Sequence, residues 1–95
     1  MSGRWNFEEL GKLMREKKRV AEMKPEEVSH ELLNRCGFIL QPAKDKLTMV
    51  EKKRVLLARA VLGKAEFAEL VNALSDERTF AVAKRKLNED FSEVF

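Results

Sequence analysis

The segment Val55-Leu56-Leu57-Ala58-Arg59-Ala60-Val61-Leu62 is apolar at every position but one. A helix with apolar side chains on nearly all sides must be surrounded by other helices. Thr48, with Glu51 three residues later, forms a capping-box pattern that predicts where this helix begins. Gly63 predicts where it ends. We therefore expect a central buried helix over residues 49–62.

Apolar spacing and end signals predict four further helices, at about residues 7–23, 25–36, 64–74 and 76–92. Asn6 with Glu9 forms a second capping box before the first of them. Pro25 suits the first position of the next. Ser75 is a good N-cap residue and is followed by two acidic residues, which predicts the start of the last helix.

Two apolar stripes mark the faces that we expect the first and last helices to bury. The first comprises Phe7, Leu10, Leu13, Met14, Val20 and Ala21, and the last comprises Phe80, Ala83, Leu87, Phe91 and Val94. Trp5 stands at the position that packs back onto Leu10 in a hydrophobic staple. Residues 38–47 are predicted to form a loop, because Pro42 disfavours a helix before it and no second strand candidate exists.

The totals agree with one small helical domain. The chain has 95 residues, of which 44% are hydrophobic and 37% are charged. That size suits a single domain, and that apolar content is too high for a disordered chain. We predict an all-α fold, a single compact domain of about five helices packed as an orthogonal bundle around the helix at 49–62.

Compartment is predicted from what the sequence lacks. Cys36 is the single cysteine, which excludes an internal disulfide framework and fits a reducing compartment. No apolar run follows Met1, so we expect no signal peptide. No stretch approaches the roughly 18 apolar residues of a membrane-spanning helix. We expect a cytoplasmic protein, or a nuclear one in a eukaryote, without a membrane partner.

The residue types needed for catalysis or metal binding are scarce. His30 is the only histidine and falls on the polar side of its helix, and Cys36 falls on an apolar face. One His and one Cys cannot form a tetrahedral zinc site, and no glycine-rich phosphate loop is present. We therefore expect no enzyme activity, no metal or other cofactor and no small-molecule substrate.

One basic segment suggests a function. Residues 44–64 carry a net charge of +5, in contrast to −3 for residues 65–95. Three cations in the first two turns of the central helix oppose the helix dipole, and two more precede it. Together these predict contacts with nucleic-acid phosphates by Lys44, Lys46, Lys52, Lys53 and Arg54. The alternative interpretation is a solvated basic face without function.

Two other segments offer binding hypotheses. Residues 64–87 have the outline of a helix-turn-helix, although Asp76 and Glu77 would face DNA phosphates and ordinary helix packing explains the pattern as well. At the C-terminal end, three apolar side chains share the spacing of anchors that dock in a groove: Phe91, Val94 and Phe95. The alternatives are closure of the protein's own core and a homodimer formed by exchange of this segment.

The sequence thus predicts a small non-enzymatic binding protein. The first hypothesis is nucleic-acid binding through residues 44–54. The second is a protein-protein adaptor or assembly subunit that docks through its C-terminal amphipathic helix.

Overall fold

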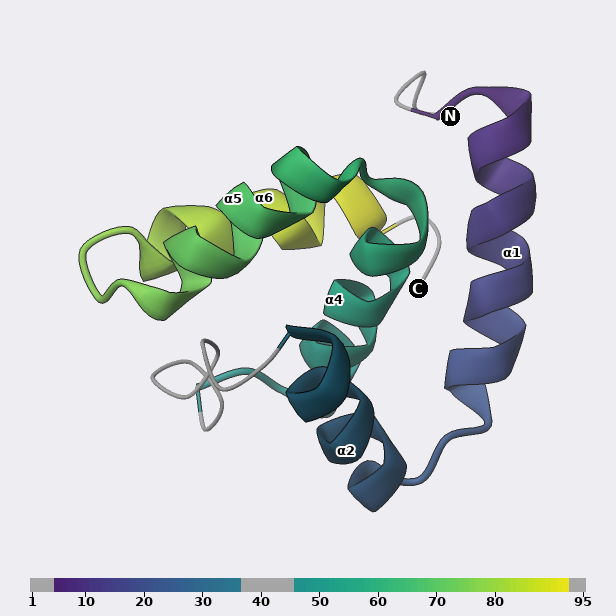
Figure 1. The fold of residues 1–95 in the computed structure, drawn as a ribbon, viewed down its shortest axis with the longest axis horizontal. Coiled ribbons are helices and arrows are strands. Elements are labelled where there is room, and N and C mark those ends of the chain that lie inside the picture. The colour runs from purple at the N-terminus through teal and green to yellow at the C-terminus, as the bar shows by residue number, and fades with distance from the viewer. Residues whose placement is uncertain (1–4, 37–45, 93–95) are drawn as a thin grey trace.

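The computed structural model describes residues 5–36 and 46–92, apart from the side chains of Arg35 and Cys36. Within these ranges the chain forms helices and no strand, so the predicted all-α single domain is confirmed (Figure 1). The helices are α1 (Phe7–Ala21), α2 (Pro25–Cys36), α4 (Met49–Val61), α5 (Lys64–Ser75) and α6 (Phe80–Phe91). Residues 37–45, and with them most of the predicted loop at 38–47, lie outside the described residues.

Two capping boxes fix the starts of α1 and α4, as predicted. The Asn6 side chain accepts a hydrogen bond from the Glu9 backbone N–H at 2.8 Å, and the Glu9 carboxylate accepts one from the Asn6 N–H at 3.1 Å. Thr48 and Glu51 make the same reciprocal pair at 3.2 and 2.9 Å. Each pair satisfies two backbone donors that a helix start would otherwise leave unpaired.

Helix α4 contributes the most deeply buried segment of the described chain. Residues 55–58 are at most 1% exposed, and the helix packs against α1, α2 and α6. In Figure 1, α4 lies between α1 and the α5–α6 pair. These contacts agree with its expected central position, whereas the orthogonal crossing of the helices stays a prediction.

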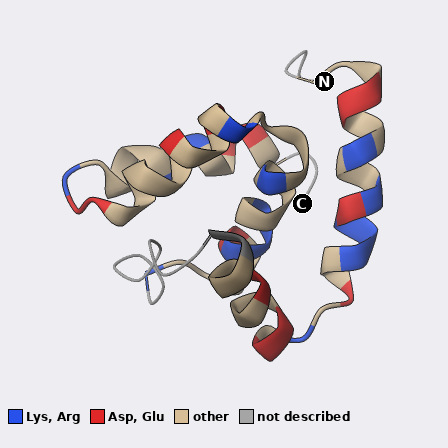
Figure 2. Ribbon diagram, viewed as in Figure 1, with Lys and Arg blue, Asp and Glu red and all other residues tan. Residues whose placement is uncertain are grey.

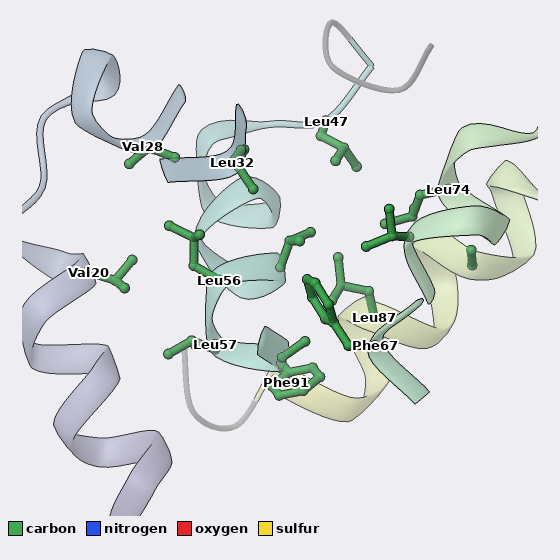
Figure 3. Packing of buried hydrophobic residues seen from close by; sticks show 14 of the residues in the cluster. Val20, Val28, Leu32, Leu47, Leu56, Leu57, Phe67, Leu74, Leu87 and Phe91 are labelled. Carbon is green, nitrogen blue, oxygen red and sulfur yellow. The ribbon is translucent and has the colours of Figure 1, made fainter. Parts of the chain in front are cut away.

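Each helix contributes buried side chains to one continuous apolar core. Figure 3 shows Val20 of α1, Val28 and Leu32 of α2, and Leu56 and Leu57 of α4 turned toward the same interior. The core continues through α5 and α6 with Phe67, Val71, Leu74, Ala83, Leu87 and Phe91. The Cα radius of gyration is 12.4 Å, close to the ~12 Å expected for one folded domain of this length. No helix in the described part of the chain is long and apolar enough to cross a membrane.

The predicted buried stripe of α1 is only partly correct. Leu13 and Val20 are fully buried and Leu10 packs against the core, but Phe7 is 93% exposed and Met14 is 55% exposed. Leu13 and Val20 are seven residues apart and so share one row, while Phe7 and Met14 form a neighbouring row about 100° around the helix. Only the first row faces α4.

The last helix begins at Phe80 and not, as predicted, at Asp76. The Ser75 hydroxyl donates to the Val71 carbonyl at 2.7 Å, which leaves Ser75 in the last turn of α5. The Asp76 carboxylate accepts a hydrogen bond from the Arg78 backbone N–H at 2.9 Å, two residues on. Both local bonds compete with N-capping, and they hold the segment between the helices in a turn.

Trp5 joins the two ends of the described chain. Its ring lies against Phe91 with centroids 5.1 Å apart and an interplanar angle of 40°. Its indole N–H donates to the Asp90 carbonyl at 3.2 Å. The sequence predicted a contact for Trp5 within the first helix, but not this contact with the end of α6. Trp5, just before the start of α1, is therefore part of the core.

Residues Phe7 and Phe91 offer a matched test of this packing. We expect Phe91→Ala to lower the free energy of unfolding by about 3 to 5 kcal/mol, because it empties a buried aromatic site. Phe7→Ala should change it by less than about 0.5 kcal/mol, because its ring is exposed. Urea denaturation followed by circular dichroism measures both. Equal losses for the two variants would contradict the packing described here.

Candidate binding surfaces

The predicted basic segment is contiguous in sequence but not in space. Lys52, Lys53 and Arg54 follow one another on α4, so their side chains leave the helix about 100° apart. Lys52 and Arg54 are therefore separated by about 200° around the axis. Neighbouring positions on a helix do not face a common direction. A phosphate backbone would have to meet these three side chains from different sides of the helix, and the predicted nucleic-acid contacts stay a prediction.

The described contacts place these cations against different helices. The Lys53 ammonium lies 3.5 Å from the Ala21 carbonyl at the end of α1. The Arg54 guanidinium donates to the Asn88 side chain of α6 at 2.6 Å. Lys46 is exposed and its ammonium lies 5.8 Å from the centre of the Phe80 ring. Lys44 lies outside the described residues.

Arg54 belongs to a polar network built around Glu51. The Glu51 side chain is 8% exposed, and its carboxylate accepts hydrogen bonds from Asn88 at 2.8 Å and from the Thr48 backbone at 2.9 Å. The Lys84 ammonium is 3.8 Å from the same carboxylate. Burial by itself raises the pKa of Glu51, but these hydrogen bonds and the Lys84 charge outweigh it and hold the pKa below its ordinary value. The network connects α4 to α6 and gives Arg54 a structural role.

This network predicts a pH dependence of stability. A carboxylate whose pKa is lower in the folded than in the unfolded protein stabilises the fold. This stabilisation is fully present above the unfolded pKa of about 4.3, and it is lost as pH falls through the folded pKa. We expect Glu51→Gln to lower the free energy of unfolding at pH 7 by about 1 to 3 kcal/mol. The difference from the unmodified protein should shrink below pH 4.5. Urea denaturation between pH 3 and 7 measures it, and a constant difference would contradict the ionised state of Glu51.

The predicted helix-turn-helix segment forms two helices that pack side by side (Figure 1). Its cations have acidic neighbours. Arg78 makes an ion pair with Asp76 at 3.2 Å, and Arg85 lies 4.0 Å from Glu89. The Lys84 ammonium lies near Glu51, as described above. These pairs reduce the positive potential that the segment would present to DNA.

The predicted C-terminal anchors are only partly described. Phe91 is 2% exposed and lies against Trp5, so in this arrangement it is a core residue. Val94 and Phe95 lie outside the described residues. The C-terminal helix therefore does not present Phe91 to a partner while Trp5 remains packed on it.

A groove lies between α5 and α6 in the described part of the chain. Its volume is about 410 Å³. The apolar part of its lining includes Leu62, Leu70, Ala73, Val82, Ala83 and Leu87. Charged side chains at its edges include Glu66, Glu69, Arg78 and Lys86. Val82 lies on this surface and is 57% exposed. We refer to this feature as the α5–α6 groove.

The sequence analysis missed this groove because its residues come from two helices. Val82 falls outside the stripe of α6 that faces the core, so nothing in the pattern of that helix explains it. Val82, a branched apolar residue outside the core stripe of its helix, was the one signal in the sequence that pointed to this surface. Leu70 and Ala73, across the groove, lie in the segment 64–87, whose pattern ordinary helix packing explains as well.

The remaining chemical groups do not form a reactive site in the described part of the chain. His30 is exposed, and its Nε2 lies 2.9 Å from the Asn34 side-chain nitrogen. No group of three or more His, Cys, Asp or Glu side chains is placed to hold a metal ion among those residues. The Cys36 side chain is not described.

Comparisons of the chain with protein-family models, with curated proteins and with solved structures found no match.

Proposed function

We propose that the protein is a non-enzymatic protein-binding module, an adaptor or assembly subunit, which holds an amphipathic helix of its partner in the α5–α6 groove. The observation that supports this proposal is the groove itself, an open apolar hollow with charged edges. This proposal, like the adaptor hypothesis from the sequence, assigns binding to the C-terminal helix. The helix would receive a partner in the groove, in place of inserting Phe91 into one.

The shape and chemistry of the groove suit a helix. The lining of the groove extends from Glu66 to Ala73 on α5 and from Val82 to Phe91 on α6, which is about 10 and 14 Å along the two helices, or about two turns. Helices that dock in grooves insert apolar side chains at positions i, i+3, i+4 and i+7, which span two turns. Apolar atoms at the centre with charged groups at the edge are the usual anatomy of a protein interface.

The lining of the groove favours binding over chemistry. It contains no His, Ser or Cys, and its one hydroxyl, that of Thr79, donates to the Ala73 carbonyl at 2.7 Å. A nucleophile with an adjacent base is the usual requirement for covalent catalysis. Glu66 and Glu69 are exposed to solvent. These observations support a role in recognition.

A selection with helical peptides tests the proposal. We expect 16-residue peptides with apolar side chains at i, i+3, i+4 and i+7 to be selected on the protein and to bind with micromolar affinity. Val82→Glu should weaken their binding at least tenfold, because it places a carboxylate on the apolar surface. Fluorescence anisotropy of the labelled peptide measures the affinity.

Ala81→Glu is the matched control, because Ala81 is exposed on the same helix but does not line the groove. It should leave peptide affinity unchanged. Failure to select any peptide, or equal binding by the Val82→Glu variant, would rule out the groove as the binding site.

Nucleic-acid binding by residues 44–54 has a separate test. Each phosphate contact contributes about −0.9 to the slope of log affinity against log salt concentration on duplex DNA. Because Lys52, Lys53 and Arg54 leave α4 in different directions, we expect a slope no steeper than about −1.8, equivalent to two contacts. Titration of a labelled random duplex at 50 and 200 mM salt measures it. A slope near −4.5 would mean that all five cations act together, and would favour the nucleic-acid hypothesis.

A further inference from the structure

We infer that the helix held in the α5–α6 groove is α1 of a second copy of this chain. This inference rests on the proposed function and names its partner. The contacting surface of α1 would be the row formed by Phe7, Leu10, Gly11 and Met14, which we call the α1 stripe. Both surfaces occur on one chain, and the described fold leaves both of them open.

The α1 stripe has the spacing of a docking helix. Phe7, Gly11 and Met14 occupy positions i, i+4 and i+7, and Leu10 adds position i+3. Phe7 is 93% exposed and Met14 is 55% exposed. At Gly11 the only nearby atom outside the helix backbone is at the end of the flexible Arg15 side chain, so another helix can approach closely there.

The fold accounts for the other face of α1 but not for this one. Leu13 and Val20, which are fully buried, belong to the face that packs on α4. Because α1 packs on α4 through that face, the α1 stripe lies beside the contact between these two helices. Within the stripe Leu10 packs partly against the core, whereas Phe7 and Met14 are exposed. Two large exposed apolar side chains on one side of a helix commonly mark an interaction site.

The charges give the docked helix a direction. In the groove, Arg78 lies at the end next to the α5–α6 turn, and Glu66 lies toward the opposite end. Helix α1 begins with Glu8 and Glu9 and later carries Arg15 and Lys18, with Glu16 between these cations, so Figure 2 shows red at its start and mixed red and blue further along. Opposite charges meet when α1 runs antiparallel to α5, with its N-terminus beside Arg78.

The lengths agree with this arrangement. Phe7 and Met14 are separated by about 10 Å along α1, and Glu66 and Ala73, seven residues apart in the lining of the groove, by about 10 Å along α5. In the antiparallel orientation Phe7 lies at the end of the groove that contains Val82. Two copies related by a two-fold axis would make this contact twice, and a head-to-tail arrangement would make it once per neighbouring pair.

A pair of complementary variants tests the inference. Sedimentation equilibrium at 10 to 300 µM should show self-association of the unmodified protein. Phe7→Lys and Val82→Glu should each weaken it at least tenfold, because each places a charge in the contact. Both sites are exposed, so both variants should retain the circular dichroism spectrum of the fold.

Mixing the two variants should restore association. The Phe7→Lys chain keeps an intact groove and the Val82→Glu chain keeps an intact α1 stripe, so one unmodified contact forms between them. In a two-fold dimer the second contact pairs the introduced lysine with the introduced glutamate. Replacing the second chain by Ala81→Glu gives the control. This variant keeps both its groove and its α1 stripe, so it should self-associate like the unmodified protein. Its mixture with Phe7→Lys can form one unmodified contact but no lysine–glutamate pair.

Three results would overturn the inference: a monomer at 300 µM, self-association that neither variant weakens, or variants that fail to recombine on mixing. A monomer whose groove still binds the selected peptides in a Val82-dependent way would retain the proposed function with a different partner. A monomer that binds no peptide would overturn both. Peptide binding that is tighter to Phe7→Lys than to the unmodified protein would add support, because that variant leaves the groove empty.

Discussion

The apolar segment of α4 sets the main constraint on this fold, because it has no polar face to turn toward water. Residues 55–58 are almost completely buried, and covering them requires neighbours on several sides. Helices α1, α2 and α6 provide this cover, while α5 packs chiefly on α6. The hollow between α5 and α6 is lined by these two helices and by Leu62, Arg78 and Thr79, and no residue of α1 or α2 lines it. The candidate groove follows from this division of contacts.

A single carboxylate serves both local and long-range structure in α4. Glu51 caps the first turn through Thr48 and also accepts a hydrogen bond from Asn88 of α6. Helix capping fixes the register of α4, and that register determines which side chains meet α6. Arg54 is held in the same network, since its guanidinium donates to Asn88. A polar group in this position requires its partners, because an unpaired buried carboxylate is costly.

The parts of the fold that depend on neighbouring residues were predictable, and those that depend on angles or on two helices were not. The starts of α1 and α4 follow from capping boxes that span only four residues each, 6–9 and 48–51. The start of the last helix was predicted four residues too early, because Ser75 and Asp76 have other local hydrogen bonds. The exposure of Phe7 depends on a rotation of about 100° that an apolar pattern does not resolve.

The candidate sites show the same division. The basic residues at 52–54 are adjacent in sequence, yet a helix directs them toward different neighbours. The groove, in contrast, combines residues such as Leu70 and Val82 that share no local pattern. Composition and spacing predicted a non-enzymatic binding protein, and this stays a prediction. The place where binding would occur required the packing of α5 against α6.

The contact of Trp5 with Phe91 also affects how the chain reaches its folded state. It closes a loop in which the hydrogen-bonded residues are 85 positions apart, and contacts of such long range are costly in chain entropy until the intervening segments are ordered. Trp5 is the only tryptophan of the chain. Its fluorescence therefore reports on the joining of the two ends, separately from helix formation, and this sequence contains its own probe of whether the ends and the helices fold in one cooperative step.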